Sequence, residues 1–282
     1  MKISIIGTGM IATEVIKMLR NEAKGIEITS IFSHSNKEKA LTLAKENDID
    51  HVYTDYAQLL KEDDADFVYI ALVNNAHYTY VRQALEAQRN VIVEKPFTST
   101  LEEAKLLAQM ARERGLYLFE AVTPLHTPNF QLVKQSLKRI APIHFAQCNF
   151  SQYSSRYERY LQGDIAPAFN PELGGGALND LNVYNINIIV GLFGEPIANQ
   201  YFANHGHNGV DTSGIMVLTY PNLTASCVAA KDSSSPSFTL IQGEKGWVRI
   251  PTTANEFGKV EIMEQGKLTS YQRKRIREPS RP

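Results

Sequence analysis

The sequence has only two cysteines, Cys148 and Cys227, among 282 residues. Two isolated cysteines are typical of a reduced, cytosolic protein with buried thiols, because disulfide-stabilised domains need several. Long apolar runs are also missing, and none approaches the roughly 20 residues that a membrane-spanning helix needs. The opening segment MKISIIGTGM reaches its glycines too early to resemble a signal peptide. We therefore expect a cytoplasmic protein that does not bind membranes.

An excess of charge of one sign is absent as well. The 29 Lys and Arg residues and the 30 Asp and Glu residues leave a formal net charge of -1. Proteins that bind nucleic acid or an anionic membrane carry a basic surface, so we expect neither partner. His205 and His207 could share one strand face, but no third metal ligand accompanies them, so we expect no metal site.

What the sequence does contain is a clear change of pattern at about residue 122. Before it, apolar runs at 2–6, 26–32, 66–72, 90–94 and 116–122 alternate with stretches of helical spacing. Fully apolar strands separated by amphipathic helices predict a parallel sheet covered on both faces. We therefore expect an α/β domain over residues 1–122.

The second half of the chain predicts a different domain, residues 123–282. A helix is expected from Pro128 to about 138, and a second one from about Gly176 to Val190. Strands are expected at 142–151, 197–204, 212–220, 223–230 and 237–242, followed by a hairpin around 264–267. Several long strands with few helices favour an α+β domain with a mostly antiparallel sheet. The basic residues that end the chain are typical of a solvated terminus.

A glycine-rich turn follows the first expected strand. Gly7, Gly9 and Ala12 form the pattern G-x-G-x-x-A between a strand and a helix, which is the context of a dinucleotide-binding turn. The first glycine permits the tight turn, and the second lets the backbone approach a pyrophosphate at the helix N-terminus. The alternative is a plain tight turn between strand and helix. The residues expected to bind the cofactor here are Gly7, Thr8, Gly9, Met10 and Ile11.

The tip of the second strand bears on which dinucleotide is bound. A carboxylate there would accept the 2′-hydroxyl of NAD. The sequence instead has Ser33, His34 and Ser35, with Lys37 nearby. Hydroxyls, an imidazole and an amine suit a 2′-phosphate better, so we expect Ser33 and His34 to favour NADP. NAD stays open, since a serine can also hold an unmodified ribose.

Two further segments combine polar residues with apolar surroundings. The fifth strand runs into Glu94-Lys95-Pro96, and ligands of open parallel sheets lie at the carboxyl ends of the strands. A lysine in this place is expected at the mouth of the nucleotide site, although a solvent-exposed strand end is the alternative. In GGGALNDLNVYNIN, Asp180, Tyr184 and Asn187 have helical spacing and share one face, which predicts either a cleft between domains or a solvent face.

Taken together, these motifs resemble the glucose–fructose oxidoreductase/inositol dehydrogenase/MocA family. The resemblance covers residues 1 to about 250 and departs from the family pattern at Asn182, where glycine is frequent. It implies an N-terminal Rossmann domain that binds NADP or NAD, and a small-molecule substrate such as a sugar, polyol or diol. It also implies homo-oligomers that pair through the C-terminal sheet. The motifs that carry it are Gly7-x-Gly9-x-x-Ala12, Asn74-x-x-His77, Glu94-Lys95-Pro96 and Gly-Gly-Gly…Asp180-x-x-x-Tyr184.

The resemblance also implies roles for individual residues. Lys95 and Tyr184 would flank the substrate carbon, while Asn74, His77, Glu94 and Lys95 would lie against the cofactor. A phenol titrates near 10, and a neighbouring ammonium lowers that value, so this pair suits removal of a hydroxyl proton. Asp180 would orient the lysine or bind a substrate hydroxyl. We therefore expect an NAD(P)-dependent dehydrogenase or reductase acting on a CH–OH group; a non-catalytic dinucleotide-sensing regulator is the alternative.

Overall fold

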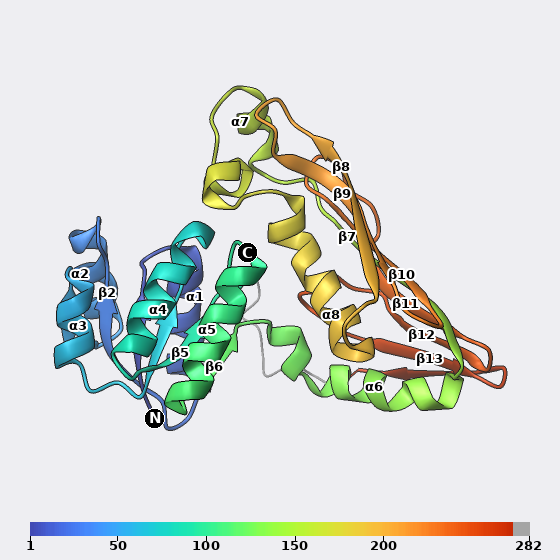
Figure 1. The fold of residues 1–282 in the computed structure, drawn as a ribbon, viewed down its shortest axis with the longest axis horizontal. Helices are drawn as coiled ribbons and strands as arrows, with labels where there is room; N and C mark the ends of the chain where they lie inside the picture. The colour runs from blue at the N-terminus through green and yellow to red at the C-terminus, as the bar shows by residue number, and fades with distance from the viewer. Residues whose placement is uncertain (273–282) are drawn as a thin grey trace. The chain divides into compact units, whose positions relative to one another are not determined.

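In a computed structural model of the protein, residues 1–272 are described, and they form two compact units (Figure 1). The first comprises Met1–Ala121 and the second begins at Val122. The expected basic terminus, residues 273–282, lies outside the described residues.

The first unit is built on a six-stranded sheet in the order β3-β2-β1-β4-β5-β6. Every neighbouring pair is parallel. The strand order reverses between β1 and β4, which is where open α/β sheets bind their ligands. The strands are β1 (Lys2–Ile6), β2 (Glu27–Phe32), β3 (His51–Tyr53), β4 (Phe67–Ile70), β5 (Asn90–Val93) and β6 (Leu118–Glu120).

Helices bury both faces of this sheet, which explains why its strands are apolar throughout. One core cluster joins α1 and α2 to one face, and another joins α3, α4 and α5 to the opposite face. The parallel α/β fold expected from the sequence is therefore confirmed, although β3 was not predicted because three residues carry too little pattern. The helices are α1 (Met10–Glu22), α2 (Lys37–Glu46), α3 (Tyr56–Glu62), α4 (His77–Glu86) and α5 (Leu101–Arg114).

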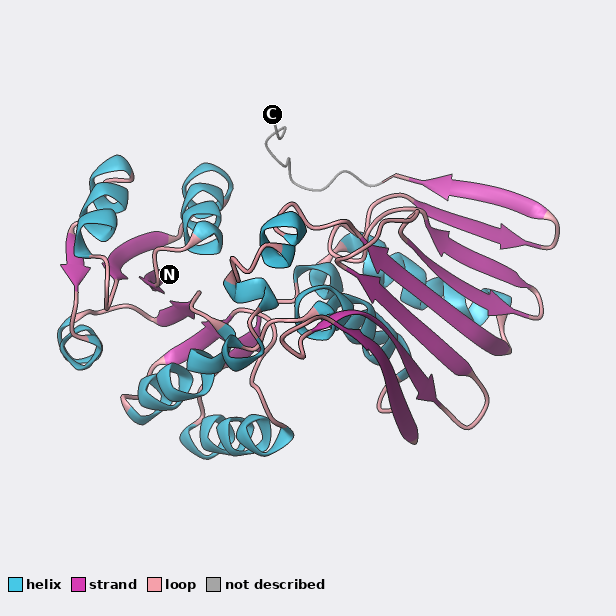
Figure 2. Ribbon diagram, turned by 90° about the horizontal axis from the view of Figure 1, so that it is seen from above, coloured by secondary structure: helices cyan, strands magenta, loops and turns pink. Residues whose placement is uncertain are grey.

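The second unit contains an eight-stranded sheet in the order β14-β13-β12-β11-β7-β10-β9-β8 (Figure 2). Within this sheet, β7–β10 is the only parallel pair among the described strands, so the sheet is mostly antiparallel, as predicted. The strands are β7 (Ile143–Ser151), β8 (Ala198–His205), β9 (Asp211–Thr219), β10 (Thr224–Ala230), β11 (Phe238–Gly243), β12 (Gly246–Ile250), β13 (Val260–Glu264) and β14 (Lys267–Tyr271).

One face of this sheet is covered by two long helices, α6 (Pro128–Ile140) and α8 (Val183–Phe193) (Figure 1). Their apolar sides join the inward residues of the strands in a single core cluster that includes Phe130, Ile188 and Ile241. Alternate residues point to the other face, where the apolar side chains of Phe202 and Ile215 are exposed. The fold therefore leaves one face of the sheet with uncovered apolar residues.

The helix predicted from Gly176 to Val190 has a different form in the structure. It begins as a π-helical turn, η5 (Leu178–Asn182), and becomes α-helical only at α8. In the wider turn the N–H of Val183 bonds the carbonyl of Leu178, five residues earlier. Single π-helical turns occur frequently at functional sites, and this one contains Asp180.

Candidate functional site

The turn between β1 and α1 requires glycine at its first position. Gly7 has φ +119°, a conformation that side chains disfavour, and a Cβ there would clash with the carbonyl oxygen of Ala71. Its N–H donates to the carbonyl of Phe32 at 2.9 Å, which fixes the turn against β2. The tight βα turn thus follows from the backbone conformation of this one residue.

At Gly9 the backbone conformation does not require glycine; the position instead faces open space. It is the N-cap of α1 with an ordinary φ of -69°, and a Cβ there would meet no protein atom within 4 Å. No side chain caps the helix, and its first turn contains no acidic residue. The side chains of Met10 and Ile11, which follow directly after Thr8 and Gly9, are exposed. An open helix N-terminus with room above it fits the pyrophosphate of a dinucleotide.

The tip of β2 places Ser33 and His34 at the carboxyl end of the neighbouring strand. Ser33 is buried, its N–H donates to the carbonyl of Tyr53 at 3.0 Å, and its Oγ accepts the N–H of Asn36 at 3.2 Å. Asn36 in turn caps α2 by accepting the N–H of Lys39. His34 is exposed. The strand tip is therefore an ordered polar turn that contains no carboxylate.

We predict that Ser33→Asp weakens NADP binding relative to NAD, because a carboxylate at this tip repels a 2′-phosphate and accepts a ribose hydroxyl. The ratio of the two dissociation constants, measured by nicotinamide fluorescence, should shift towards NAD by about tenfold or more. Ser33→Ala is the matched control, since it removes the hydroxyl without adding charge. A wild-type protein that already binds NAD far more tightly than NADP would contradict this prediction.

The segment after β5 is held by contacts at successive residues. Glu94 accepts a hydrogen bond from the Tyr69 hydroxyl at 2.5 Å, and burial raises the pKa of its carboxyl. The carbonyl of Pro96 lies 2.9 Å from Nδ1 of His77. The N–H of Phe97 donates at 3.0 Å to Glu120, whose pKa is also raised by burial. Lys95 therefore extends from a segment that is fixed on both sides.

His77 is fully buried at the start of α4, directly after the short turn that begins at Asn74. Its Nε2 lies 3.2 Å from the carbonyl of Leu72, so the ring connects the loop after β4 with the segment after β5. Burial lowers the pKa of the imidazole and favours its neutral form. His77 thus positions the Lys95 segment, and contacts of Asn74 and His77 with the cofactor remain predictions.

In the second unit, the glycines before η5 make room for their neighbours. A Cβ on Gly175 would lie 2.6 Å from the carbonyl oxygen of Pro167, and one on Gly176 would clash with the Asp211 carboxylate. That carboxylate accepts the N–H of Leu178 at 2.6 Å and so caps the start of the helix. Asp211 was not predicted from the sequence, because it lies far along the chain from the helix that it caps.

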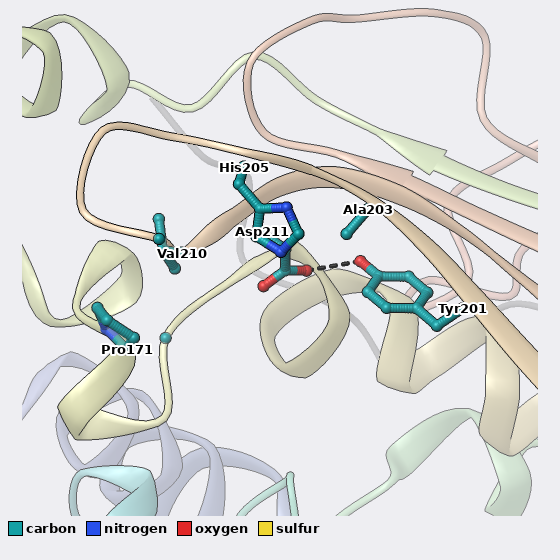
Figure 3. A pocket seen from close by; sticks show the side chains of 8 residues that line it. Pro171, Tyr201, Ala203, His205, Val210 and Asp211 are labelled. Atoms are coloured by element: carbon teal, nitrogen blue, oxygen red, sulfur yellow. Dashed lines mark hydrogen bonds between the residues drawn. The ribbon is translucent and has the colours of Figure 1, made fainter.

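A cavity of about 360 Å³ opens beside this cap (Figure 3). The Tyr201 hydroxyl donates to Asp211 at 2.6 Å, and burial together with this bond raises the pKa of the phenol. The imidazole of His205 lies on the same wall. Within residues 1–272, no group of three or more His, Cys, Asp or Glu side chains could hold a metal ion. None of the helices in that range is long and apolar enough to span a membrane.

Asp180 lies in η5, and Tyr184 follows at the start of α8. Oδ2 of Asp180 accepts a hydrogen bond from the ammonium group of Lys231 at 2.8 Å, in an ion pair that the sequence did not predict. The ring of Tyr184 packs against Phe150 on β7, with 6.2 Å between the ring centroids. Lys95 belongs to the first unit and these residues to the second, so the expected approach of Lys95 to Tyr184 remains a prediction.

Asn182, where the family pattern often has glycine, is fully buried beneath η5. Its amide donates to the carbonyl of Cys227 at 2.9 Å and accepts from Asn185 at 2.9 Å. Asn185 also donates to the carbonyl of Val228. These bonds fasten the π-turn to β10, so Asn182 has a structural role in this chain.

Both units match known protein families. A model of the oxidoreductase family with an NAD-binding Rossmann fold, GFO_IDH_MocA, matches residues 1–122, and a model of the GFO/IDH/MocA C-terminal domain matches residues 130–249. The chain is also 34% identical over 245 residues to the uncharacterized oxidoreductase YgjR of Escherichia coli (strain K12), covering 87% of this chain and 74% of the relative. The chain belongs to the Gfo/Idh/MocA family.

Other Gfo/Idh/MocA proteins resemble it as well. The scyllo-inositol 2-dehydrogenase (NADP(+)) IolU of Bacillus subtilis (strain 168) is 32% identical over 254 residues, which cover 89% of this chain and 76% of IolU. The 3-ketoreductase KijD10 of Actinomadura kijaniata, solved with NADP and TDP-benzene, superposes with a TM-score of 0.81 at 26% identity, covering 96% of this chain and 84% of KijD10. The chain is thus an oxidoreductase of this NAD(P)-dependent family.

Proposed function

We propose that the protein transfers hydride between NAD(P) and a CH–OH group of a small hydroxylated substrate, such as a sugar, polyol or diol. The observation that carries this proposal is the fixed segment around Lys95, at the same edge of the sheet as the open N-terminus of α1. A protein that only senses a dinucleotide needs the open helix N-terminus but no anchored lysine. The name of the relative IolU, a scyllo-inositol dehydrogenase, supports the substrate class.

The proposed chemistry assigns one task to each polar group. When bound, the nicotinamide accepts or supplies the hydride. Tyr184 takes the hydroxyl proton during oxidation and returns it during reduction, a type of proton transfer that contributes about 10²–10⁴ in rate. Lys95 favours the phenolate through its positive charge and polarises the substrate oxygen. Asp180 binds a substrate hydroxyl or orients the lysine.

The proposed cofactor is NADP, with NAD as the alternative. Ser33 and His34 at the end of β2 provide a hydroxyl and an imidazole without a carboxylate. IolU is named for NADP(+), and KijD10 was solved with NADP, which supports the same choice.

A substrate screen tests the proposal directly. Purified protein is mixed with NADP or NAD and with inositols, aldoses, other polyols and diols, and nicotinamide absorbance is followed. We expect turnover with at least one of these classes. Tight dinucleotide binding without turnover of any of them would instead favour the regulatory alternative.

We also propose that two copies pair through the face of the C-terminal sheet that α6 and α8 leave uncovered. Phe202, Ile215 and Leu268 expose 54%, 43% and 54% of their surface on the side away from the core. Phe202 and Ile215 are direct neighbours on β8 and β9, whereas Leu268 lies on β14 at the opposite edge of the sheet. Apolar residues exposed on an uncovered sheet face are typical of a protein–protein contact.

We predict that Ile215→Lys converts the dimer to a monomer, because pairing would bury two like charges at the interface. Sedimentation or light scattering after gel filtration should show the mass falling by half. Leu106→Lys is the control, since Leu106 is exposed on α5 in the first unit. A wild-type protein that is monomeric at high concentration would contradict the proposed pairing.

A further inference from the structure

Lys231 is a buried lysine that the sequence did not single out. It follows directly after β10 and is only 2% exposed. Burying an ammonium is costly unless it is paired and hydrogen-bonded. Here the ammonium donates to Asp180 at 2.8 Å and to the carbonyl of Ala168 at 2.6 Å, and it lies 4.3 Å from the centre of the Phe169 ring.

These contacts connect three segments around the start of α8. The carbonyl of Ala168 also accepts the N–H of Gly176, so the glycine turn and Lys231 share one acceptor. The N–H of Asp180 bonds the carbonyl of Gly176. Lys231 therefore reaches the π-turn in two ways, through the Asp180 carboxylate and through the backbone that precedes it.

Asp180 differs from Lys231 in its surroundings. The aspartate side chain is 38% exposed, whereas the lysine is almost completely enclosed. An exposed aspartate can adopt several side-chain rotamers in water, and each would aim its carboxylate differently. A charged hydrogen bond to a rigid, buried donor selects one of them.

We propose that Lys231 is a positioning residue of the candidate site: it holds Oδ2 of Asp180 and so fixes the direction in which the carboxylate faces the substrate or Lys95. This inference rests on the proposed function. Lys231 itself touches neither substrate nor cofactor and acts through Asp180. A well-packed apolar side chain could fill the same space, but it could not hold the Asp180 carboxylate in one orientation, which is the reason we give for the buried charge.

The test is a double-mutant cycle with Lys231→Met and Asp180→Asn. Methionine keeps the length and packing beside Phe169 but removes the charge and the hydrogen bonds. We expect Lys231→Met to lower kcat about tenfold or more, with the dissociation constant of NADP(H) unchanged. In the Asp180→Asn background the same change should alter kcat little, because groups that act as a unit are not additive. The pH–rate profile should change in Lys231→Met as it does in Asp180→Asn.

Two further variants separate positioning from stability. Lys231→Gln introduces an amide that can donate to Ala168 but carries no charge. Its melting temperature should therefore stay close to that of the wild type, while its kcat should be as low as that of Lys231→Met. Tyr160→Phe removes a hydrogen bond to Asn208, which itself donates to the carbonyl of Phe169. It loosens the same loop without touching Asp180, so the melting temperature should fall while kcat and the pH profile stay unchanged.

The possible outcomes distinguish this inference from the proposed function. An active wild type with unchanged kcat in Lys231→Met overturns the positioning role alone. Equal losses with and without Asp180, or a failure of both Lys231 variants to fold, would assign Lys231 to stability and overturn it as well. A wild type that binds NADP but turns over no substrate overturns the proposed function, and the inference with it.

Discussion

Lys95→Ala and Tyr184→Phe should each lower kcat by about 10²–10⁴-fold. The kcat of the double mutant should be only slightly lower than that of the less active single mutant. The reason is that the two groups are proposed to act on one proton: without the ammonium the phenolate is disfavoured, and without the phenol the ammonium has no base to assist. Steady-state kinetics on the substrate found in the screen measure all three variants.

The controls for this cycle come from the same chain. Lys245→Ala removes an exposed lysine, and Tyr117→Phe removes the hydroxyl of an exposed tyrosine; neither should change kcat. In the Lys95 and Tyr184 variants, the affinity for NADP(H) should change far less than kcat. Strictly additive losses from Lys95 and Tyr184 would show that the two residues do not form a catalytic pair.

The same pair has a pH signature. A phenol titrates near 10 in water, and a neighbouring positive charge lowers that value. In Lys95→Met the charge is lost, so the base becomes available only at higher pH, and the rising limb of the oxidation profile should move to higher pH. A profile that keeps its wild-type position would mean that another group sets the basicity of the site.

Gly9→Val should abolish tight dinucleotide binding while the protein stays folded. Two observations explain why binding should be lost without loss of folding: the φ of -69° at Gly9 is ordinary for any amino acid, and an added Cβ meets no protein atom within 4 Å. The valine would therefore fill space that the proposed pyrophosphate needs. Titration of NADP(H) by fluorescence should show the dissociation constant rising by about 100-fold or more.

Gly7 provides the contrast that makes this experiment decisive. Valine at Gly7 would clash with Ala71 and adopt a disfavoured backbone conformation, so Gly7→Val should lower the melting temperature. Gly9→Val should leave the melting temperature near that of the wild type. Unchanged nucleotide affinity in Gly9→Val would exclude the β1–α1 turn as the binding site.

The sequence was most informative where its pattern was long and repeated. The apolar strands of the first 122 residues predicted the parallel sheet, and the alternating strands after Ile143 predicted the second, because burial on two faces or on one leaves different periodicities. It failed for β3, which has three residues, and for η5, where a π-turn replaces the expected α-helix. Both features are too short to show a repeat of apolar residues in the sequence.

The sequence carries a local signal for Lys231. The segment VAAKD ends a buried strand with a lysine and a carboxylate, much as VIVEK does at Lys95. The same argument, that a lysine after an apolar strand must be paired or used, applied to both segments.

The sequence by itself determined the parallel α/β class of the first domain, the glycines of its turn and the family to which the chain belongs, because these depend on hydrophobic periodicity, local conformation and contiguous motifs. The order of the six strands came from the tertiary structure. The tertiary structure alone decided that Lys231 pairs with Asp180 and that Asp211 caps the helix beside it. It also decided that Asn182 fastens the π-turn to β10. Each of these contacts joins residues that are more than 30 positions apart, and only the packing of strands and helices brings such residues within hydrogen-bonding distance.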